Sequence, residues 1–447
     1  MNNKTPKTMK HIFTVLILIG TLSSFAQKQW TLKECVEHAL EHNISVKQSQ
    51  NNLLVNAQDI TASKGQFLPS VNGSFGERMS IGSGFDPVSN QRINNQTTHS
   101  FNYNFSVNQN VFNGFRTLNL YKQSLLNQEI NNLELARIKD NISLNVVNGY
   151  LNVLFNIENL EIAKNQFDFS KQQLRQVKNL VEAGVQPKAN LYTSEATLGR
   201  DEQQVTIAEN NYNLSLLSLS QLLQVPFNGF EVKVISLDSP SEVLLYKDVT
   251  PIISYAFENR NEIVIAEKNI VNAELNTEIS KSGYLPSVSF GYGFGSVWSE
   301  SSNDFLKQDY FRELDLNKGH NFNLNVNIPI FSRFQNKTAV AKSRIQEENS
   351  ALNLQQAKLD LESNIQRAFT DAQAAFKAYA AAKKSLVSQE LAFNNSKERY
   401  TIGNITAFDL EQARVQFINA QSSLINAKFD FIFKTKVLDF YMGKEIL

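Results

Sequence analysis

The chain has 447 residues, with 43 basic and 43 acidic side chains and therefore no net charge. This balance argues against a nucleic-acid-binding protein, which would carry a basic surplus or stripe. The single cysteine, Cys35, excludes an intrachain disulfide and a thiolate metal cluster.

The N-terminus has the pattern of a secretory signal peptide. Lys4, Lys7 and Lys10 precede the apolar run IFTVLILIG, and small residues follow at Ser24 and Ala26. The run is too short to cross a bilayer as a helix, which takes about 20 apolar residues. We therefore predict a signal peptide over residues 1–26 and a mature chain that leaves the cytoplasm. No later stretch is apolar enough for a membrane helix, so a membrane segment should consist of strands.

The stretch HALEH, His38–His42, fits the H-x-x-E-H pattern of a zinc peptidase family, with Glu41 as the base. The pattern is short, however, and neither a third ligand nor a second helix that could supply one is evident. The second half of the chain has Tyr255 and Asn259 at the corresponding positions. We therefore predict a solvent-exposed structural helix here, and a chain that is not an enzyme and holds no cofactor or metal.

Four segments alternate apolar and polar side chains, which is typical of β-strands with one apolar face. They are Val71–Met79, Phe101–Val111, Val288–Trp298 and Phe322–Ile330, with long loops expected over residues 80–98 and 299–320. Such strands fit a soluble sandwich with asparagines in water, or a membrane barrel with aromatic residues in lipid. In the barrel the lipid-facing residues would be Phe101, Tyr103, Phe105, Phe290, Tyr292, Phe294, Phe322, Leu324 and Val326.

Two proline-free intervals, from Arg116 to Gly184 and from Gln335 to Gly403, predict very long helices. Each permits an uninterrupted helix of more than 60 residues, about 100 Å long at 1.5 Å per residue. Ordinary globular helices have about 11–12 residues. Because a further helix is predicted after each glycine, the chain should contain two long helix hairpins.

Heptad seams run along these helices and predict near-parallel helices in left-handed contact. One seam comprises Leu191, Ser194, Leu198, Asp201, Val205, Ala208 and Tyr212. The others comprise Leu361, Ile365, Ala368, Ala372, Ala375, Tyr379, Ala382 and Leu386, and Leu410, Ala413, Phe417, Ala420, Leu424, Ala427 and Phe431. Asp201 is the exception, because it places a charge in an otherwise apolar or small-residue seam.

The same order of elements occurs twice, which indicates an internal repeat. The tetrapeptide LPSV starts at Leu68 and again at Leu285, 217 residues later, and Gly184 and Gly403 lie 219 residues apart. We predict a first repeat over residues 27–235 and a second over 236–447, both within one structural unit.

Four strands are too few to close a membrane barrel alone. An unpaired strand edge in lipid costs several kcal/mol per unsatisfied group, and the smallest bacterial barrels have about 8 strands. A barrel shared between several copies of the chain is therefore predicted. The soluble sandwich would instead leave strand pairs attached to helices that are far too long for a globular domain.

These features together resemble the TolC family of outer-membrane efflux proteins, over essentially the whole mature chain. The resemblance is carried by the duplicated LPSV, the paired strands, and YTIGNITAFDLEQARVQFINAQ (Tyr400–Gln421), which is similar to the family's helical tip. It implies a mostly α fold with a long coiled-coil α-helical barrel and a membrane β-barrel. Three identical chains would each give four strands to a 12-stranded β-barrel. The location implied is the outer membrane of a diderm bacterium, with an extension into the periplasm.

The resemblance also implies a function and partners. The trimer would be a passive duct of a tripartite efflux or type I secretion system, embedded in outer-membrane lipid. Its partners would be a periplasmic adaptor (membrane fusion) protein at the hairpin tips near Gly184 and Gly403, and an inner-membrane RND, ABC or MFS transporter. The sequence has no G-x-x-x-x-G-K-[ST] phosphate loop, so the driving force would come from a partner. The alternative is a periplasmic coiled-coil structural protein without a pore.

In that family, aspartate rings and tyrosine–arginine links form a gate at the periplasmic tips. Tyr400 and Asp409 match this pattern, whereas Ile405 stands where the arginine would be. Gln412 and Asn190 stand where further aspartates would be. These five residues are the predicted gate, with one acid per chain. Asp409 alternatively fits a helix N-terminal acid that is favoured by capping and by the helix dipole.

Overall fold

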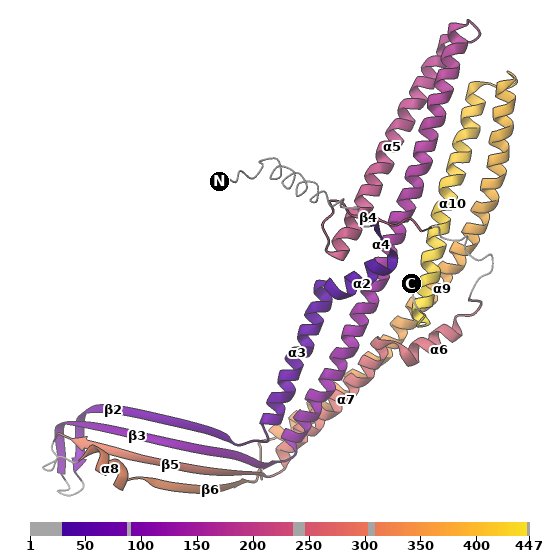
Figure 1. Cartoon of the computed structure of the whole chain (residues 1–447). Helices are drawn as coiled ribbons and strands as arrows, with labels where there is room; N and C mark the ends of the chain where they lie inside the picture. Colours follow the sequence, from indigo (N-terminus) through magenta and orange to yellow (C-terminus); the bar gives the residue numbers. More distant parts are fainter. Residues whose placement is uncertain (1–28, 87–90, 236–245, 303–308, 445–447) are drawn as a thin grey trace, which may run out of the picture. The chain divides into compact units, whose positions relative to one another are not determined.

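The computed structural model, drawn in Figure 1, describes residues 29–86, 91–235, 246–302 and 309–444. The chain divides into two compact units. Unit 1 comprises Met1–Gln48, Ala136–Arg260 and Leu359–Leu447, and unit 2 comprises Ser49–Leu135 and Asn261–Lys358. Each unit contains segments of both predicted repeats, and the repeat boundary stays a prediction. The predicted signal peptide, residues 1–26, lies outside the described residues.

The two long helices confirm the interpretation of the proline-free intervals. Helices α4 (Arg116–Glu182) and α9 (Gln335–Thr401) have 67 residues each, which corresponds to about 100 Å. Helix α5 (Lys188–Leu223) follows α4 after a short turn, and α10 (Ala407–Tyr441) follows α9 in the same way. No helix among the described residues is both long and apolar enough to cross a membrane.

Packing in unit 1 follows the heptad seams. Every predicted seam position on α5, α9 and α10 is buried or half-buried. Between α9 and α10, Ala375, Tyr379 and Phe431 form one buried cluster. Farther along the same helix pair, the rings of Phe393 and Phe417 stack with their centroids 5.4 Å apart. The predicted coiled-coil contact between these helices is therefore present.

A short strand pair in unit 1 was not predicted. Strand β1 (Gln29–Trp30) pairs in parallel with β4 (Glu231–Val232). The buried Tyr150 hydroxyl of α4 donates a hydrogen bond to the Lys233 carbonyl at 2.6 Å and lies 3.3 Å from the Trp30 carbonyl. Burial raises the pKa of Tyr150, so the hydroxyl keeps its proton and remains a donor. In the part of this unit that the structure describes, the further helices are α2 (Leu32–His42) and α6 (Thr250–Asn259).

Two further helices flank the first part of α4 in unit 2. They are α3 (Ile44–Gly65), which begins at the end of unit 1, and α7 (Asn261–Lys281), which continues into a short 3-10 helix, Ser282–Tyr284. Side-chain amides connect them to α4: Asn131 donates to Asn56 at 2.7 Å, and Gln123 donates to Asn272 at 2.6 Å. These contacts are polar, so the heptad rule did not indicate them.

The strands of unit 2 form one antiparallel sheet in the order β2-β3-β5-β6. Their bounds are β2 (Ser70–Asp86), β3 (Gln91–Asn113), β5 (Ser287–Ser301) and β6 (Gly319–Asn327). All four predicted strands are present, and each lies beside its neighbour in the drawn sheet (Figure 1).

The predicted loops and strand ends need correction. Most of the expected loop at residues 80–98 is strand, because the β2–β3 ladder continues to the pair Asp86–Gln91. This part of the ladder is rich in polar residues and glycine, so it lacks the apolar alternation on which the prediction relied. The expected loop at 299–320 contains helix α8 (Tyr310–Leu316). Strand β6 ends at Asn327 rather than Ile330, consistent with Pro329, which has no N–H to donate to a ladder.

One face of the sheet is apolar and the other carries amides. Directly opposite residues of an antiparallel pair share a face, and the register places Phe105 opposite Phe294. The nine residues that were predicted to face lipid all lie on this one face. The other face carries asparagine, serine and glycine. At Gly291 an added Cβ would collide with the Asn323 side chain, so the glycine makes room for the amide opposite it.

Candidate functional site: the helix tips and a buried charge cluster

Both helix hairpins turn through the same backbone conformation. Gly184 and Gly403 have positive φ values of 74° and 76°, which disfavour residues with a Cβ. In each turn the amide of the residue after the glycine donates to the carbonyl of the residue four positions before the glycine. These hydrogen bonds are Val185 to Leu180 and Asn404 to Arg399, both 2.8 Å long. This is the Schellman pattern that ends helices at a glycine. The two predicted tip glycines therefore have equivalent local structures.

Asp409 lies at the start of α10 and forms a capping box. Thr406 donates to the Asp409 carboxylate from its hydroxyl at 2.7 Å and from its backbone amide at 3.0 Å. The amide of Asp409 donates back to the Thr406 hydroxyl at 3.2 Å. The hydrogen bond from the Thr406 side chain, followed by that from its backbone, lowers the pKa of Asp409. The carboxylate is therefore charged, and it has the structural role that was the alternative to gating.

Two other predicted gate residues, Tyr400 and Asn190, are connected by Gln186, which was not predicted as a gate residue. The Gln186 amide donates to the Tyr400 hydroxyl at 3.4 Å, and Asn190 donates to Gln186 at 3.4 Å. The three residues thus connect the first hairpin tip to the second. Ile405 is half-buried and Gln412 is exposed; neither has a described contact with this group. Gln186 is neither charged nor at a family gate position, so the sequence carried no signal for it.

Large apolar side chains are exposed around both tips. Val185 and Tyr192 at the first tip are 69% and 65% exposed, and Ile402 and Phe408 at the second are 77% and 75% exposed. Grouped exposed apolar side chains are typical of protein interaction surfaces. The tips therefore have the composition of a docking surface.

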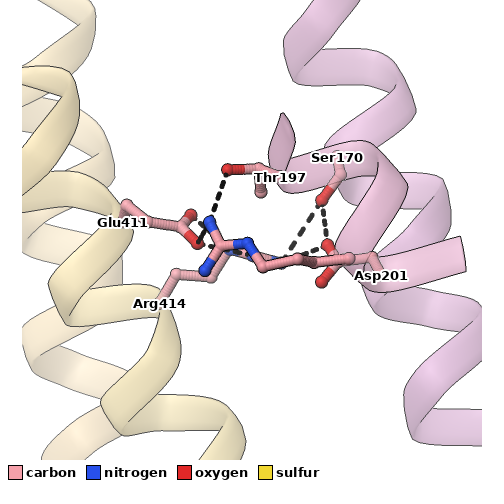
Figure 2. Close-up of polar contacts among 6 residues, drawn as sticks. Ser170, Thr197, Asp201, Glu411 and Arg414 are labelled. Carbon is pink, nitrogen blue, oxygen red and sulfur yellow. Dashed lines mark hydrogen bonds and ion pairs between the residues drawn. The ribbon is translucent and has the colours of Figure 1, made fainter. Parts of the chain in front are cut away.

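A buried charge cluster joins α4, α5 and α10 in unit 1 (Figure 2). Arg414 of α10 donates to the Asp201 carboxylate of α5 at 2.9 Å and to Ser170 of α4 at 3.3 Å. Ser170 also donates to Asp201. The other side of the guanidinium makes two bonds of 2.8 Å to Glu411, one turn earlier on α10. Together these contacts satisfy both charges of the buried pair.

The cluster is held in a low-dielectric environment. Arg414 is 4% exposed and Asp201 is 8% exposed. Burial by itself lowers the pKa of Arg414, but hydrogen bonds to Glu411 and Asp201 outweigh it and raise that pKa. Removing two charges from water is costly, and only good hydrogen-bond geometry compensates for it. The cluster therefore joins α4, α5 and α10 at one point and gives Asp201 charged and hydroxyl partners at its seam position.

The HALEH stretch lies on α2. The rings of His38 and His42 stack with centroids 4.2 Å apart, and His42 Nδ1 lies 3.9 Å from the Glu41 carboxylate. Within the described ranges, no group of three or more histidine, cysteine, aspartate or glutamate residues is placed to hold a metal ion. The geometry found at the tips and in the cluster can position helices and present charge.

The structure combines an antiparallel sheet that has one apolar face with two very long helix hairpins. This combination is typical of membrane proteins whose strands lie in the bilayer and whose helices extend out of it. A profile of the outer membrane efflux protein family matches residues 35–224 and 252–443, and the chain belongs to this family. It is therefore an outer-membrane protein of efflux or export that extends into the periplasm.

BepC and TolC are distant relatives in sequence, and the solved structures of CusC and CmeC share the fold. The chain is 21% identical to outer membrane efflux protein BepC of Brucella suis, over 95% of this chain and 88% of BepC. It is 20% identical to outer membrane protein TolC of Vibrio cholerae, over 66% of each chain, just under two thirds. The solved structure of CusC has a TM-score of 0.78 at 16% identity and covers 95% of this chain and 96% of CusC. The Campylobacter jejuni CmeC outer membrane channel has a TM-score of 0.77 at 18% identity, over 92% and 85% of the two chains.

Proposed function

We propose that three copies of this chain form a passive duct of a tripartite efflux or type I secretion system. The observation that carries the proposal is the four-stranded sheet, whose apolar face is suited to lipid and whose amide face is suited to a water-filled lumen. Strands β2 and β6 end the described sheet, and edges in lipid must be paired. Pairing β2 of one copy with β6 of the next in a trimer closes a barrel of 12 strands.

The proposed partners meet the other end of the duct. The exposed apolar side chains around Gly184 and Gly403 fit a periplasmic adaptor protein, which would connect the duct to an inner-membrane RND, ABC or MFS transporter. One relative, OpmQ of Pseudomonas aeruginosa, is a pyoverdine export outer membrane protein, which supports an export role for the duct. A coiled-coil protein without a pore would not need the apolar sheet face.

The proposed gate lies at the same tips. Asp409 contributes one exposed carboxylate per chain, and three such charges around a narrow axis would favour cations and repel one another. Tyr400 and Asn190, connected through Gln186, would hold the two hairpins of a chain together. Ile405 and Gln412 replace charges of the family pattern, so this gate would depend less on ion pairs.

Planar-bilayer recording of the purified protein tests the duct. We expect a trimer in mild detergent and discrete, cation-preferring conductance steps after insertion. A monomer that leaves bilayers silent under gentle extraction would contradict the proposal.

Two substitutions separate the gate charge from the helix cap. Asp409→Asn removes the carboxylate, and Thr406→Ala breaks the capping box but keeps the carboxylate. If Asp409 belongs to the gate, cation preference should fall in the first variant and persist in the second. An unchanged preference in Asp409→Asn removes Asp409 from the gate, and equal losses in both variants assign the effect to the cap.

A further inference from the structure

Helix α8 is a short helix between β5 and β6, at the end of the sheet remote from the strand–helix connections. The Asp309 side chain caps it by accepting hydrogen bonds from the amides of Phe311 at 3.1 Å and Arg312 at 3.3 Å. The helix also contacts the sheet through ring contacts and hydrogen bonds.

The contacts place α8 on the apolar face of the sheet. The Tyr310 ring lies 5.0 Å from Trp298 and 5.7 Å from Phe101, between centroids, and these two residues are opposite each other on that face. Ser296, on the same face as Trp298, donates to the Leu314 carbonyl at 2.7 Å. Asn317, just after the helix, donates to the Val297 carbonyl at 2.9 Å.

Phe101 and Trp298, which Tyr310 of α8 contacts, lie at the end of the uncharged part of this face. From Val288 to Trp298 the strand advances by about 33 Å at roughly 3.3 Å per residue. At a tilt of about 40° this covers about 25 Å of depth, the height of the apolar band on outer-membrane barrels. In the described strands, this face carries no Asp, Glu, Lys or Arg between those levels. Glu77, opposite Phe101, is the first acid.

The side of α8 that points away from the sheet combines apolar and charged residues. Phe311 is 80% exposed and Leu316 is 64% exposed, and Arg312 and Asp315 are exposed beside them. Aromatic and apolar side chains mixed with charges are typical of helices that lie in a membrane interface. A second copy of the chain would instead favour a continuous apolar contact.

We propose that α8 is an interfacial helix that rests in the outer leaflet of the outer membrane. Phe311 and Leu316 enter the acyl-chain region, and Arg312 and Asp315 stay at the level of the lipid headgroups. The proposal rests on the proposed function, because it requires the apolar sheet face to meet lipid. It adds to that face a helical anchor that fixes how deeply the sheet sits.

Spin labels on single cysteines test this placement in the full-length protein, reconstituted into vesicles of phosphatidylethanolamine and phosphatidylglycerol. Cys35 is fully buried, so wild type serves as the labelling blank. Labels at Phe311→Cys and Leu316→Cys report on α8. Leu324→Cys reports on the sheet face, and Lys188→Cys, at an exposed position of the first helix tip, reports on water. Collision rates with oxygen and with a nickel chelate distinguish lipid from water.

We expect an oxygen-to-nickel collision ratio several-fold higher at positions 311, 316 and 324 than at position 188. If position 324 is in lipid but 311 and 316 give the ratio of position 188, the interfacial helix is wrong and the duct survives. If 311 and 316 are shielded from both reagents, a neighbouring copy covers α8 and the proposal is also wrong. If position 324 itself gives the aqueous ratio, the proposed membrane setting of the sheet fails as well.

Discussion

Asp201 places a carboxylate in a heptad seam, where an apolar side chain would pack without loss of hydration. Its partner Arg414 is 213 residues away in the chain and lies beside the predicted seam rather than in it. The sequence could therefore indicate that Asp201 needs a partner, but not which residue supplies it. The same holds at the tips, where Gln186 connects Tyr400 to Asn190 through neutral amide contacts.

Arg414→Met should be strongly destabilising. Breaking a buried pair leaves Asp201 uncompensated, which costs about 3–5 kcal/mol. Adding Asp201→Leu should recover most of the loss, because it restores an apolar seam. Lys164→Met is the matched control: Lys164 pairs with Glu209 at 3.6 Å between α4 and α5 while both are about half exposed, so about 0–1 kcal/mol is expected. Denaturant unfolding of the trimer in detergent measures all three, and equal effects of Arg414→Met and Lys164→Met would contradict the role of the cluster.

Helices and strands with a clear sequence pattern were predicted, whereas the elements without one were missed. The absence of proline was sufficient to locate α4 and α9, because proline is the residue that most strongly interrupts a helix. The polar extension of the β2–β3 ladder was missed, because backbone hydrogen bonds rather than an apolar face continue it. Helix α8 was also missed. Its one local signal is Asp309, which precedes the helix and caps it.

Gly403→Ala should destabilise the second hairpin tip. No atom lies within 4 Å of where its Cβ would be, so the cost is that of the left-handed backbone, about 1–2 kcal/mol. Gly199→Ala is the control, since Gly199 lies inside α5 and is equally open. There alanine should stabilise the helix by about 0.5–1 kcal/mol. Hydrogen exchange of the amides around each position measures the two effects, and the same sign at both would refute the argument.

For the whole molecule, the register of the sheet establishes two faces, and the assembly follows from its edges. Strands β2 and β6 have described neighbours on one side, whereas β3 and β5 have them on both. The number of copies cannot be predicted from one chain's contacts, because closure depends on the curvature of the assembled sheet. The family resemblance, and not the strand pattern, indicated three.

Hydrogen exchange in the assembled protein should show slow amides along both β2 and β6. If these edges pair between copies, their outward N–H groups are bonded and exchange about as slowly as those of β3 and β5. Dissociation into monomers should release every second amide of each edge, because alternate residues point away from the existing partner. Rapid exchange of the β2 edge in the intact assembly would exclude edge-to-edge closure.

The equal length of α4 and α9, 67 residues each, constrains how such a protein can change size. Removing seven residues from α4 would keep its heptad phase but shorten it by about 10 Å, which would separate Gln186 from Tyr400 of the other hairpin. A tolerated deletion must therefore occur in all four hairpin helices at once. We therefore expect family members that differ in length to differ by whole heptads in all four hairpin helices. Helix length should be conserved more strictly than side-chain identity.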